Sequence, residues 1–385
     1  MSEPRDPIYL DHNATTPLLP EVVDAMVPYL REHFGNPSSA HVYGRRAREA
    51  VARARAQVAA LIDAAAEEIL FVANGTEANN LAIRGVTAAL PEKWYVVTSV
   101  IDHPATTEPC RELEQHGWRV KWLPVDETGR VRVADAVALL RNYTALITLM
   151  HANNETGVLQ PIAEIAREAR ARGVLVHTDA AQSVGKLPVS VEALGVDLLT
   201  VVGHKFGAPK GVGALYVRKG TPLRPFLRGA GHEHGLRPGT ENVASIVGLG
   251  VACEVARHTV EGEAKRVRAL RDELWERLRA RVPGLALHGH PEERLPNTLN
   301  VRFPGVSGSA LLATTPEVAA STGSACHAGE ESASSVLTAM GVEPREALGS
   351  VRLSLGRTTT HEDVVASADA LANAWTRLSA GQLKG

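Results

Sequence analysis

Short apolar runs alternate with amphipathic helical stretches over the first half of the chain. Each run has the length of a buried strand, and the intervening stretches have the residue spacing of helices. Parallel strands need helical crossovers, so this alternation predicts an α/β fold with a mostly parallel sheet covered by helices on both faces. The predicted strands cover residues 69–73, 94–98, 145–150, 174–177 and 198–202, and the predicted helices cover 45–62, 77–90, 103–116 and 161–172.

The pattern changes after about residue 250. A long, charged helix is predicted over residues 263–281, and a final helix is predicted to begin at His361. Short strands are predicted at residues 285–288, 298–303 and 351–355. We therefore expect a smaller α+β domain in the carboxy-terminal part of the chain.

The composition narrows the classes of partner. With 44% hydrophobic and 22% charged residues, the 385-residue chain can bury one large core or two unequal ones. A formal net charge of -2 gives no general attraction to nucleic acid or to an anionic membrane. No apolar stretch approaches the roughly 20 residues that span a bilayer, and residues 1–7 lack the apolar core of an export signal, so we expect a cytoplasmic protein.

Polar motifs follow the predicted strands directly. Ligands of parallel sheets bind at the carboxyl ends of the strands, which is where these motifs fall. They are Asn74-Gly75-Thr76, His103, Asn153-Asn154, Asp179 and His204-Lys205.

Lys205 and Asp179 together favour a pyridoxal phosphate site. An isolated loop lysine is more often solvated, and an isolated aspartate at a strand end more often forms a turn. A pyridoxal phosphate site, however, needs both an imine-forming lysine and an acid beside the pyridinium nitrogen. Asn74-Gly75-Thr76 precedes a predicted helix whose positive end could hold the phosphate, although a helix N-cap alone would also place Thr or Asn here.

The three cysteines, Cys110, Cys253 and Cys326, are widely spaced and form no CxxC pair, so neither a disulfide framework nor a structural zinc site is expected. Cys110 and Cys253 lie in helix-like segments and are predicted to be packing residues. Cys326 lies among Gly, Ser and Ala, which would leave its sulfur reachable. His232 and His234 flank an acid but lack the HExxH spacing, and no metal site is expected.

Several strings, in one order along nearly the whole chain, resemble the cysteine desulfurases of the NifS and IscS kind, within the class V aminotransferase group of pyridoxal-phosphate enzymes. They are residues 9–17, 34–37, 153–157, 201–206, 237–242 and 351–357.

This resemblance implies a type I fold of pyridoxal-phosphate transferases, with a seven-stranded sheet. It also implies a large cofactor-binding domain over residues 17–255 and a small domain formed by residues 1–16 and 256–385, which carries the catalytic cysteine. A homodimer is implied, because Thr240 would reach the cofactor phosphate of the second subunit.

The resemblance also assigns roles to residues. Gly75, Thr76 and His204 would bind the phosphate, Asp179 the ring nitrogen and Gln182 the phenolic oxygen, while Lys205 would form the imine. His103 would stack on the ring and move protons, although it could simply begin a helix. Arg352, with Asn36 and Asn154, would bind the substrate carboxylate, and the alternative for Arg352 is a salt bridge to a neighbouring acid.

The activity implied is removal of sulfur from L-cysteine, giving L-alanine and a persulfide on Cys326 for transfer to a sulfur-acceptor protein. Two departures from the family bear on this expectation. Val202 stands where many relatives have serine, and residues 332–334 read Ser-Ala-Ser in place of Glu-Pro-Ser.

Three other functions remain open at this point. Selenocysteine lyases share many of the same strings, but the mammalian ones have an aspartate after the active-site histidine, where this chain has Pro104. A non-catalytic sulfur carrier would not need the full set of Lys205, Asp179 and Arg352. An aminotransferase or epimerase of the same fold would have no use for the thiol of Cys326.

Overall fold

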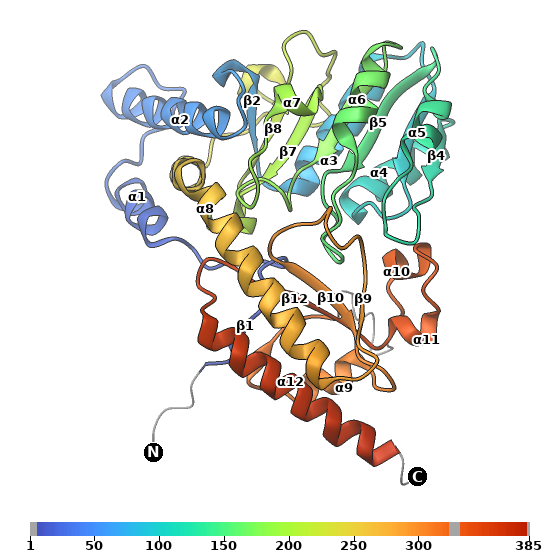
Figure 1. Ribbon diagram of the computed structural model, residues 1–385. Coiled ribbons are helices and arrows are strands. Elements are labelled where there is room, and N and C mark those ends of the chain that lie inside the picture. Colours follow the sequence, from blue (N-terminus) through green and yellow to red (C-terminus); the bar gives the residue numbers. More distant parts are fainter. Residues whose placement is uncertain (1–5, 323–331, 383–385) are drawn as a thin grey trace.

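A seven-stranded sheet forms the larger part of the computed structural model, which describes residues 6–322 and 332–382 (Figure 1). Strands β3 to β7 run parallel to one another, and β8 alone is antiparallel to both of its neighbours. The predicted mostly parallel sheet is confirmed. Its order is β2 (Ile69–Val72), β8 (Gly213–Val217), β7 (Leu198–Val202), β6 (Leu175–Asp179), β5 (Thr144–Met150), β3 (Tyr95–Ser99) and β4 (Arg119–Leu123).

Two strands of this sheet were not predicted from the apolar runs. β4 is an edge strand, and Arg119 and Lys121 are exposed while Val120 and Leu123 are buried. Such half-exposed strands lack a continuous apolar run. β8 is buried but short and follows a glycine-rich loop, so its five residues gave no separate signal.

Helices cover both faces of the sheet because successive strand residues point to opposite sides. Phe71 and Ile147 pack into the cluster on one face, and their neighbours Leu70 and Leu146 pack into the cluster on the other. The first face is covered by α2 (Val42–Leu61), α6 (Ile162–Arg170) and α7 (Val191–Leu194), and the second by α3 (Gly75–Ala89) and α4 (Pro104–Gln115). Pro161, predicted in the first turn of its helix, is the N-cap that precedes α6.

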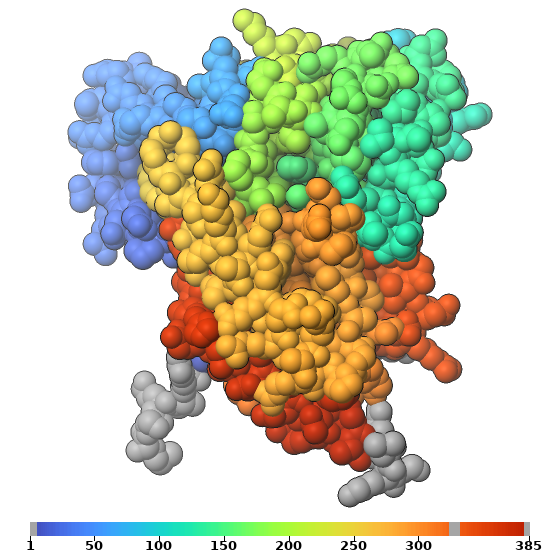
Figure 2. Space-filling view, viewed as in Figure 1, coloured from blue at the N-terminus to red at the C-terminus, as the bar shows by residue number. Residues whose placement is uncertain are grey.

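A second, smaller sheet lies beside the first (Figure 1). The orange and red carboxy-terminal part of the chain that contains it occupies the lower half of the space-filling view (Figure 2). Its antiparallel order is β12 (Ser350–Ser354), β10 (Thr298–Arg302) and β9 (Ala286–Leu287), and α12 (His361–Gln382) packs with it. β1 (Ile8–Tyr9) pairs in parallel with β11 (Val318–Ala319), which brings the amino-terminal segment to this part of the molecule. The remaining helices are α1 (Pro20–Arg31), α5 (Val133–Leu139), α9 (Gly308–Ala313), α10 (Ser335–Ala339) and α11 (Pro344–Ala347), with the 3-10 turn η1 (Ala66–Glu68).

The long helix α8 (Val243–Arg281) is twice the length predicted, because its first half is small and apolar rather than charged. Leu249 and Cys253 pack into the large core, whereas Leu274 and Leu278 pack into the small one. One 18-residue window of α8, with a mean hydropathy of 1.3, is apolar enough to cross a membrane, contrary to the expectation from sequence. Since 56% of that window is buried inside the protein, core packing accounts for its composition.

Two separate apolar clusters support our proposed division into residues 17–255 and residues 1–16 with 256–385. Leu10 packs with Leu353 and Leu371 in the smaller cluster, so the amino-terminal segment shares the carboxy-terminal core. α8 connects the two clusters as one continuous helix. In the proposed division, the small domain would therefore combine segments from both ends of the chain.

Candidate active site

A cavity of about 360 Å³ opens at the carboxyl ends of the parallel strands. This is where open α/β sheets bind ligands, and the volume suits a small molecule. Nine of the residues singled out from the sequence line it: Gly75, Thr76, His103, Asn154, Asp179, Gln182, His204, Lys205 and Arg352.

Lys205 ends the 3-10 turn η2 (Gly203–Lys205), which follows β7. Its Nζ donates hydrogen bonds to the backbone oxygens of Asn13 at 2.7 Å and Ala14 at 3.0 Å. Burial, and then the positive charge of Arg352, lower the pKa of Lys205 to about 8. About a tenth of this amine is therefore uncharged at pH 7, far more than for an ordinary lysine, and that fraction can act as a nucleophile.

Asp179 ends β6 and is held by neutral groups. Its Oδ2 accepts a hydrogen bond from Asn79 Nδ2 at 2.7 Å, and its Oδ1 accepts one from Ala181 N at 2.9 Å. Asn79 Oδ1 in turn accepts from the Thr200 hydroxyl at 2.7 Å, and His177 Nε2 lies 3.0 Å from that hydroxyl. Full burial lowers the pKa of His177 to about 4, so this chain of contacts fixes the carboxylate without adding a charge.

His103 is the N-cap of α4, as the structural alternative from sequence proposed, and it also lines the cavity. Its Nδ1 accepts a hydrogen bond from Ala105 N at 3.1 Å, so a neutral ring carries its proton on Nε2. Burial lowers the pKa of His103, the charge of Asp179 raises it and the charge of Lys205 lowers it further. The net lowering favours a neutral imidazole at pH 7.

The first turn of α3 forms one end of the cavity. Asn74 caps this helix by accepting a hydrogen bond from Glu77 N at 2.9 Å, so the N-cap interpretation is confirmed for Asn74. The positive helix end remains beside Gly75 and Thr76, which line the cavity. A Cβ atom at Gly75 would lie 2.6 Å from Val202 Cγ2, so the close approach of α3 to β7 requires glycine there.

His204 lies beside this end of the cavity as a neutral group. Its Nδ1 is 3.1 Å from the Thr15 hydroxyl. Burial, followed by the charges of Lys205, Lys210 and Lys186, lowers the pKa of His204 to about 4. It can therefore hydrogen-bond an anion near neutral pH without carrying a charge.

Lys186 was missed in the sequence, although it stands four residues after Gln182. Its Nζ donates to Gln182 Oε1 at 2.7 Å and to Asn13 Oδ1 at 2.8 Å. Gln182 Nε2 donates to Asn13 O at 3.0 Å, so both ends of this amide are fixed. The loss of water around this half-buried amine, with the nearby charges of Lys205 and Arg352, places the pKa of Lys186 well below its ordinary value.

Arg352 reaches the cavity from β12, in the small sheet. Its Nη2 donates to Asp11 Oδ1 at 2.6 Å and its Nη1 to Asn154 O at 3.1 Å. The salt bridge to an acid, which was the alternative from sequence, is therefore present. The Nε of Arg352 is buried and has no hydrogen-bond partner among the described residues, so the guanidinium keeps a donor that it does not use.

Two predicted residues do not line the cavity of their own chain. Asn36 is exposed, and its Oδ1 accepts a hydrogen bond from Ser38 N at 2.9 Å. Thr240 is also exposed. Their roles stay predictions, and Thr240 was expected to act on a second subunit.

Cys326 lies outside the described residues, but the chain on both sides of it is described. Ser321 pairs with Arg352 through the backbone, with N to O distances of 2.6 and 3.3 Å. Ser334 donates a hydrogen bond to Glu155 Oε2 at 2.5 Å, next to Asn154. Both flanks of the segment are thus fixed beside residues of the cavity.

The other two cysteines, Cys110 and Cys253, are buried free thiols, as predicted. Burial raises the pKa of both thiols, which disfavours the nucleophilic thiolate. Among residues 6–322 and 332–382, no group of three or more His, Cys, Asp or Glu side chains could hold a metal ion.

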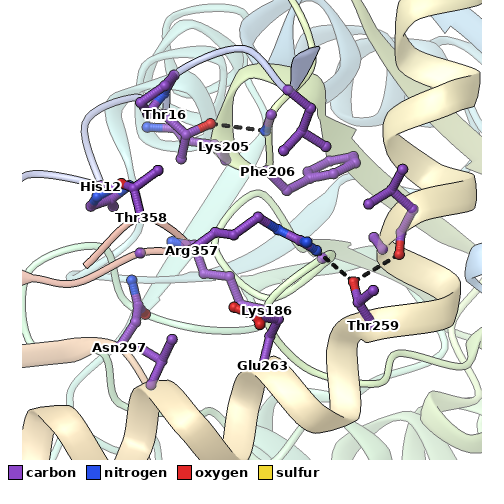
Figure 3. Close-up of a pocket in the computed structure, with 18 of the residues that line it drawn as sticks. His12, Thr16, Lys186, Lys205, Phe206, Thr259, Glu263, Asn297, Arg357 and Thr358 are labelled. Carbon is purple, nitrogen blue, oxygen red and sulfur yellow. Dashed lines mark hydrogen bonds between the residues drawn. The ribbon is translucent and has the colours of Figure 1, made fainter. Parts of the chain in front are cut away.

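A second cavity of about 200 Å³ lies on the other side of Lys205, against α8 (Figure 3). Arg357 donates a hydrogen bond to Thr259 there. Leu19, Val255 and Val267 contribute an apolar lining. The first cavity is the candidate active site because it combines Lys205 with Asp179 and His103, which do not line the second.

These features define an α/β enzyme with a half-buried amine nucleophile, and comparison with known proteins identifies its family. The model of the family described as aminotransferase class-V matches residues 8–366. Cysteine desulfurase IscS of Dictyoglomus turgidum is 46% identical over 94% of this chain and 93% of its own length. The chain therefore belongs to the class V aminotransferase family, in its cysteine desulfurase group.

Solved structures agree with this assignment. A NifS-like protein superposes with a TM-score of 0.90 and 37% identity, over 97% of this chain and 99% of its own. A structure described as SspA in complex with cysteine has a TM-score of 0.80 and 36% identity, over 90% of this chain and 98% of its own. The fold and the family inferred from sequence are both confirmed.

Proposed function

We propose that this protein uses pyridoxal 5′-phosphate to transfer the sulfur of L-cysteine to Cys326, with release of L-alanine. The observation that carries the proposal is one cavity that joins Lys205, Asp179 and His103 to Arg352. These groups are an amine nucleophile, a ring-nitrogen partner, a neutral imidazole and a cation for a carboxylate. The desulfurase relatives and the cysteine complex of a similar structure support the same substrate.

The residues of the cavity fit pyridoxal phosphate. The close contact of Gly75 with Val202 brings the positive end of α3 to one end of the cavity, as a phosphate requires. The fixed carboxylate of Asp179 suits a protonated ring nitrogen. When bound, this cofactor supplies an electron sink for the carbanion formed at the α-carbon of an amino acid. We assign it to Gly75, Thr76, Asp179, Gln182, His204 and Lys205, with Thr240 contributed by a second subunit.

Lys205 and His103 are the groups that move protons in this proposal. Lys205, with its pKa of about 8, can accept a proton from the α-carbon and return it. His103 carries its proton on Nε2 when neutral, because Nδ1 accepts from Ala105 N. It can therefore donate a hydrogen bond through Nε2 to a group in the cavity, and it takes up a proton only when Nδ1 leaves its bond to Ala105 N.

Arg352 binds the substrate carboxylate in this proposal, with Asn154 and Asn36 as its helpers. The guanidinium is already paired with Asp11, so the incoming carboxylate has to share it. A guanidinium has five N–H donors and its contacts with Asp11 and Asn154 use two of them, so donors remain for an additional anion. A planar fork of donors is well suited to hold two carboxylates at once.

Cys326 receives the sulfur. Its thiolate forms a new sulfur–sulfur bond with the substrate, the carbon–sulfur bond breaks, and its electron pair with a proton completes alanine. The reaction needs no external oxidant, since the enzyme thiol and cysteine give persulfide and alanine. Cys326 is the fifth residue after Ser321, a reach of roughly 17 Å, so the fixed flank at Arg352 supports access to the cavity.

A homodimer is part of the proposal. Several large apolar side chains are exposed around the end of α1 and the start of α2, and such a patch marks an interaction surface. Phe34 is 78% exposed, and its ring stacks on that of Tyr43 with 5.4 Å between centroids. A second copy of this chain would cover this patch and bring its Thr240 to the neighbouring cavity.

We further propose a cytoplasmic location and a protein that accepts the sulfur. Two buried free thiols, Cys110 and Cys253, suit a reducing compartment. A persulfide on Cys326 has to be passed on for the enzyme to turn over again, so an acceptor thiol is required. Labelled sulfur from cysteine, followed into a panel of candidate carrier and scaffold proteins, would identify that acceptor.

The decisive test is Cys326→Ala. We expect alanine production from cysteine to collapse while the bound cofactor keeps its visible absorbance. Cys110→Ala is the matched control and should retain activity, because that thiol is buried. Persistent cysteine turnover in Cys326→Ala would overturn the persulfide route. Purified protein without cofactor absorbance would favour the sulfur-carrier alternative, and selenocysteine assayed in parallel tests the lyase alternative.

A further inference from the structure

The segment that joins β8 to α8 carries Thr240 near its end. It contains the 3-10 turn η3 (Glu233–Gly235), in which three consecutive residues have φ values of 45°, 57° and 78°. Two of these residues, Glu233 and His234, are not glycine. Their left-handed backbone is costly, so surrounding contacts must hold it.

Glu233 supplies the first of these contacts. Its carboxylate accepts two hydrogen bonds from Arg55 of α2, at 2.6 and 2.7 Å, and one from Phe71 N at 2.8 Å. The Glu233 side chain is 2% exposed, so the ion pair is shielded from water. These contacts fix the turn to α2 and β2.

Arg237 supplies the second contact, and this one reaches the active-site cavity. Its Nε donates to Glu77 Oε1 at 2.9 Å and its Nη2 to Glu77 Oε2 at 3.4 Å. Glu77 belongs to the first turn of α3, where its N–H is bound by the capping Asn74. Gly75 and Thr76 of the same turn line the cavity, so Arg237 holds the helix turn that forms its phosphate end.

Thr240 stands three residues beyond Arg237 and is exposed, outside the cavity of its own chain. We propose that Arg237 is a positioning residue that couples the two cofactor sites of a dimer. Through Glu77 it ties the phosphate end of one cavity to the segment that presents Thr240 to the other. This inference rests on the proposed function, because it requires a dimer that binds pyridoxal phosphate.

The coupling predicts that substitution of Arg237 weakens cofactor binding at both sites of the dimer. Without the ion pair, α3 loses a contact at the phosphate end of its own cavity. The 237–240 segment loses its anchor at the same time, and with it the position of Thr240 at the cavity of the second subunit. If Arg237 supported only its own chain, its substitution would weaken cofactor binding at one site alone.

Mixed dimers separate these outcomes. Two differently tagged copies are co-expressed, and one carries Lys205→Ala so that a single site per dimer holds the cofactor covalently. Arg237→Gln is placed either on the chain with intact Lys205 or on the Lys205→Ala chain. The release rate of pyridoxal phosphate from each holoenzyme is followed by loss of its visible absorbance, against a mixed dimer without Arg237→Gln.

Both arrangements should release the cofactor about tenfold faster than the reference, within the range typical of coupled sites. Unchanged release when Arg237→Gln lies on the Lys205→Ala chain would overturn the proposal, since Arg237 would then act only within its own chain. A wild-type protein that is monomeric by sedimentation, or that shows no cofactor absorbance, would refute the proposed function before any variant is made.

Control variants test that the ion pair itself is responsible. Arg237→Lys keeps a charge beside Glu77 and should restore part of the retention. Glu77→Gln should match Arg237→Gln, and the double variant should be no worse than either, as for two residues in one contact. Arg84, like Glu77, belongs to α3, and Arg84→Gln breaks its exposed ion pair to Glu112 of α4 and should change nothing. Additive effects of Glu77→Gln and Arg237→Gln would contradict the coupling.

Discussion

The two sides of the cavity hold their functional groups by different kinds of contact. On the side of the large sheet, Asp179 is held by neutral partners, with Asn79 bonded to it directly and His177 further behind. On the side of the small sheet, Arg352 is held by an opposite charge on Asp11.

This difference separates two tasks. Neutral partners fix a carboxylate in place without neutralising it, which suits a group that must pair with a cofactor. An acid beside Arg352 satisfies a buried cation before the substrate arrives but then competes for it. The large sheet therefore holds Asp179 in place before a cofactor binds. The small sheet supplies Arg352, whose charge Asp11 and the substrate carboxylate have to share.

The largest expected effect lies on the large-sheet side, at Lys205. Lys205→Ala should lower alanine production on the order of 10³-fold, because the site loses both its nucleophile and a proton carrier. Lys210→Ala, an exposed lysine of the same loop, should change activity little. Steady-state rates with cysteine measure both. An active Lys205→Ala enzyme would remove the chemical role assigned to this side of the cavity.

On the small-sheet side, Arg352→Gln should lower kcat/KM on the order of 10²-fold, mainly by raising KM, because Asp11 and the substrate carboxylate both lose their cation. Asp11→Asn should be mild, since asparagine can still accept a hydrogen bond while the competing charge is gone. Initial rates over a range of cysteine concentrations separate the two. Equal damage by both variants would show that the ion pair is structural only.

Acid should lower the free energy of unfolding through His177, which lies behind Asp179 on the large-sheet side. Its folded pKa of about 4 lies below the ordinary value of 6.5, so the unfolded chain binds a proton first as pH falls. The contribution of His177 to the free energy of unfolding is therefore fully present above about pH 6.5. It is lost towards pH 4, with a slope of about 1.4 kcal/mol per pH unit. Urea unfolding of wild type and His177→Gln across this range measures it. An equal slope in the variant would exclude His177 as the source.

The smallest effect is expected at Val202, beside the phosphate end. Val202→Ser adds a hydroxyl where many relatives have one, and such a hydrogen bond contributes about 1.5 kcal/mol, the low end of the range for a charged partner. Release of pyridoxal phosphate should slow by up to about tenfold. Val202→Ala controls for the lost bulk against Gly75. Faster release from the serine variant than from the alanine variant would contradict a phosphate contact here.

The sequence located the groups at strand ends but not the groups behind them. Lys205, Asp179 and His103 follow apolar runs, so a local pattern places them at one edge of a sheet. Asn79 lies 100 residues from Asp179, and Glu77 lies 160 residues from Arg237, so no local pattern could pair them. The first half of α8 was missed as well, because its small apolar residues resemble a loop or a strand as much as a helix.

The sequence by itself determined the alternating α/β architecture, the edge of the sheet where the chemistry lies and the residue types gathered there. These features depend on apolar periodicity and on residues next to each other in the chain. Only the tertiary structure decided that Asp11 pairs with Arg352 and that Lys186 donates a hydrogen bond to Gln182. It also decided the lowered pKa of Lys205, because the loss of water and the nearness of charges arise only when distant segments pack together.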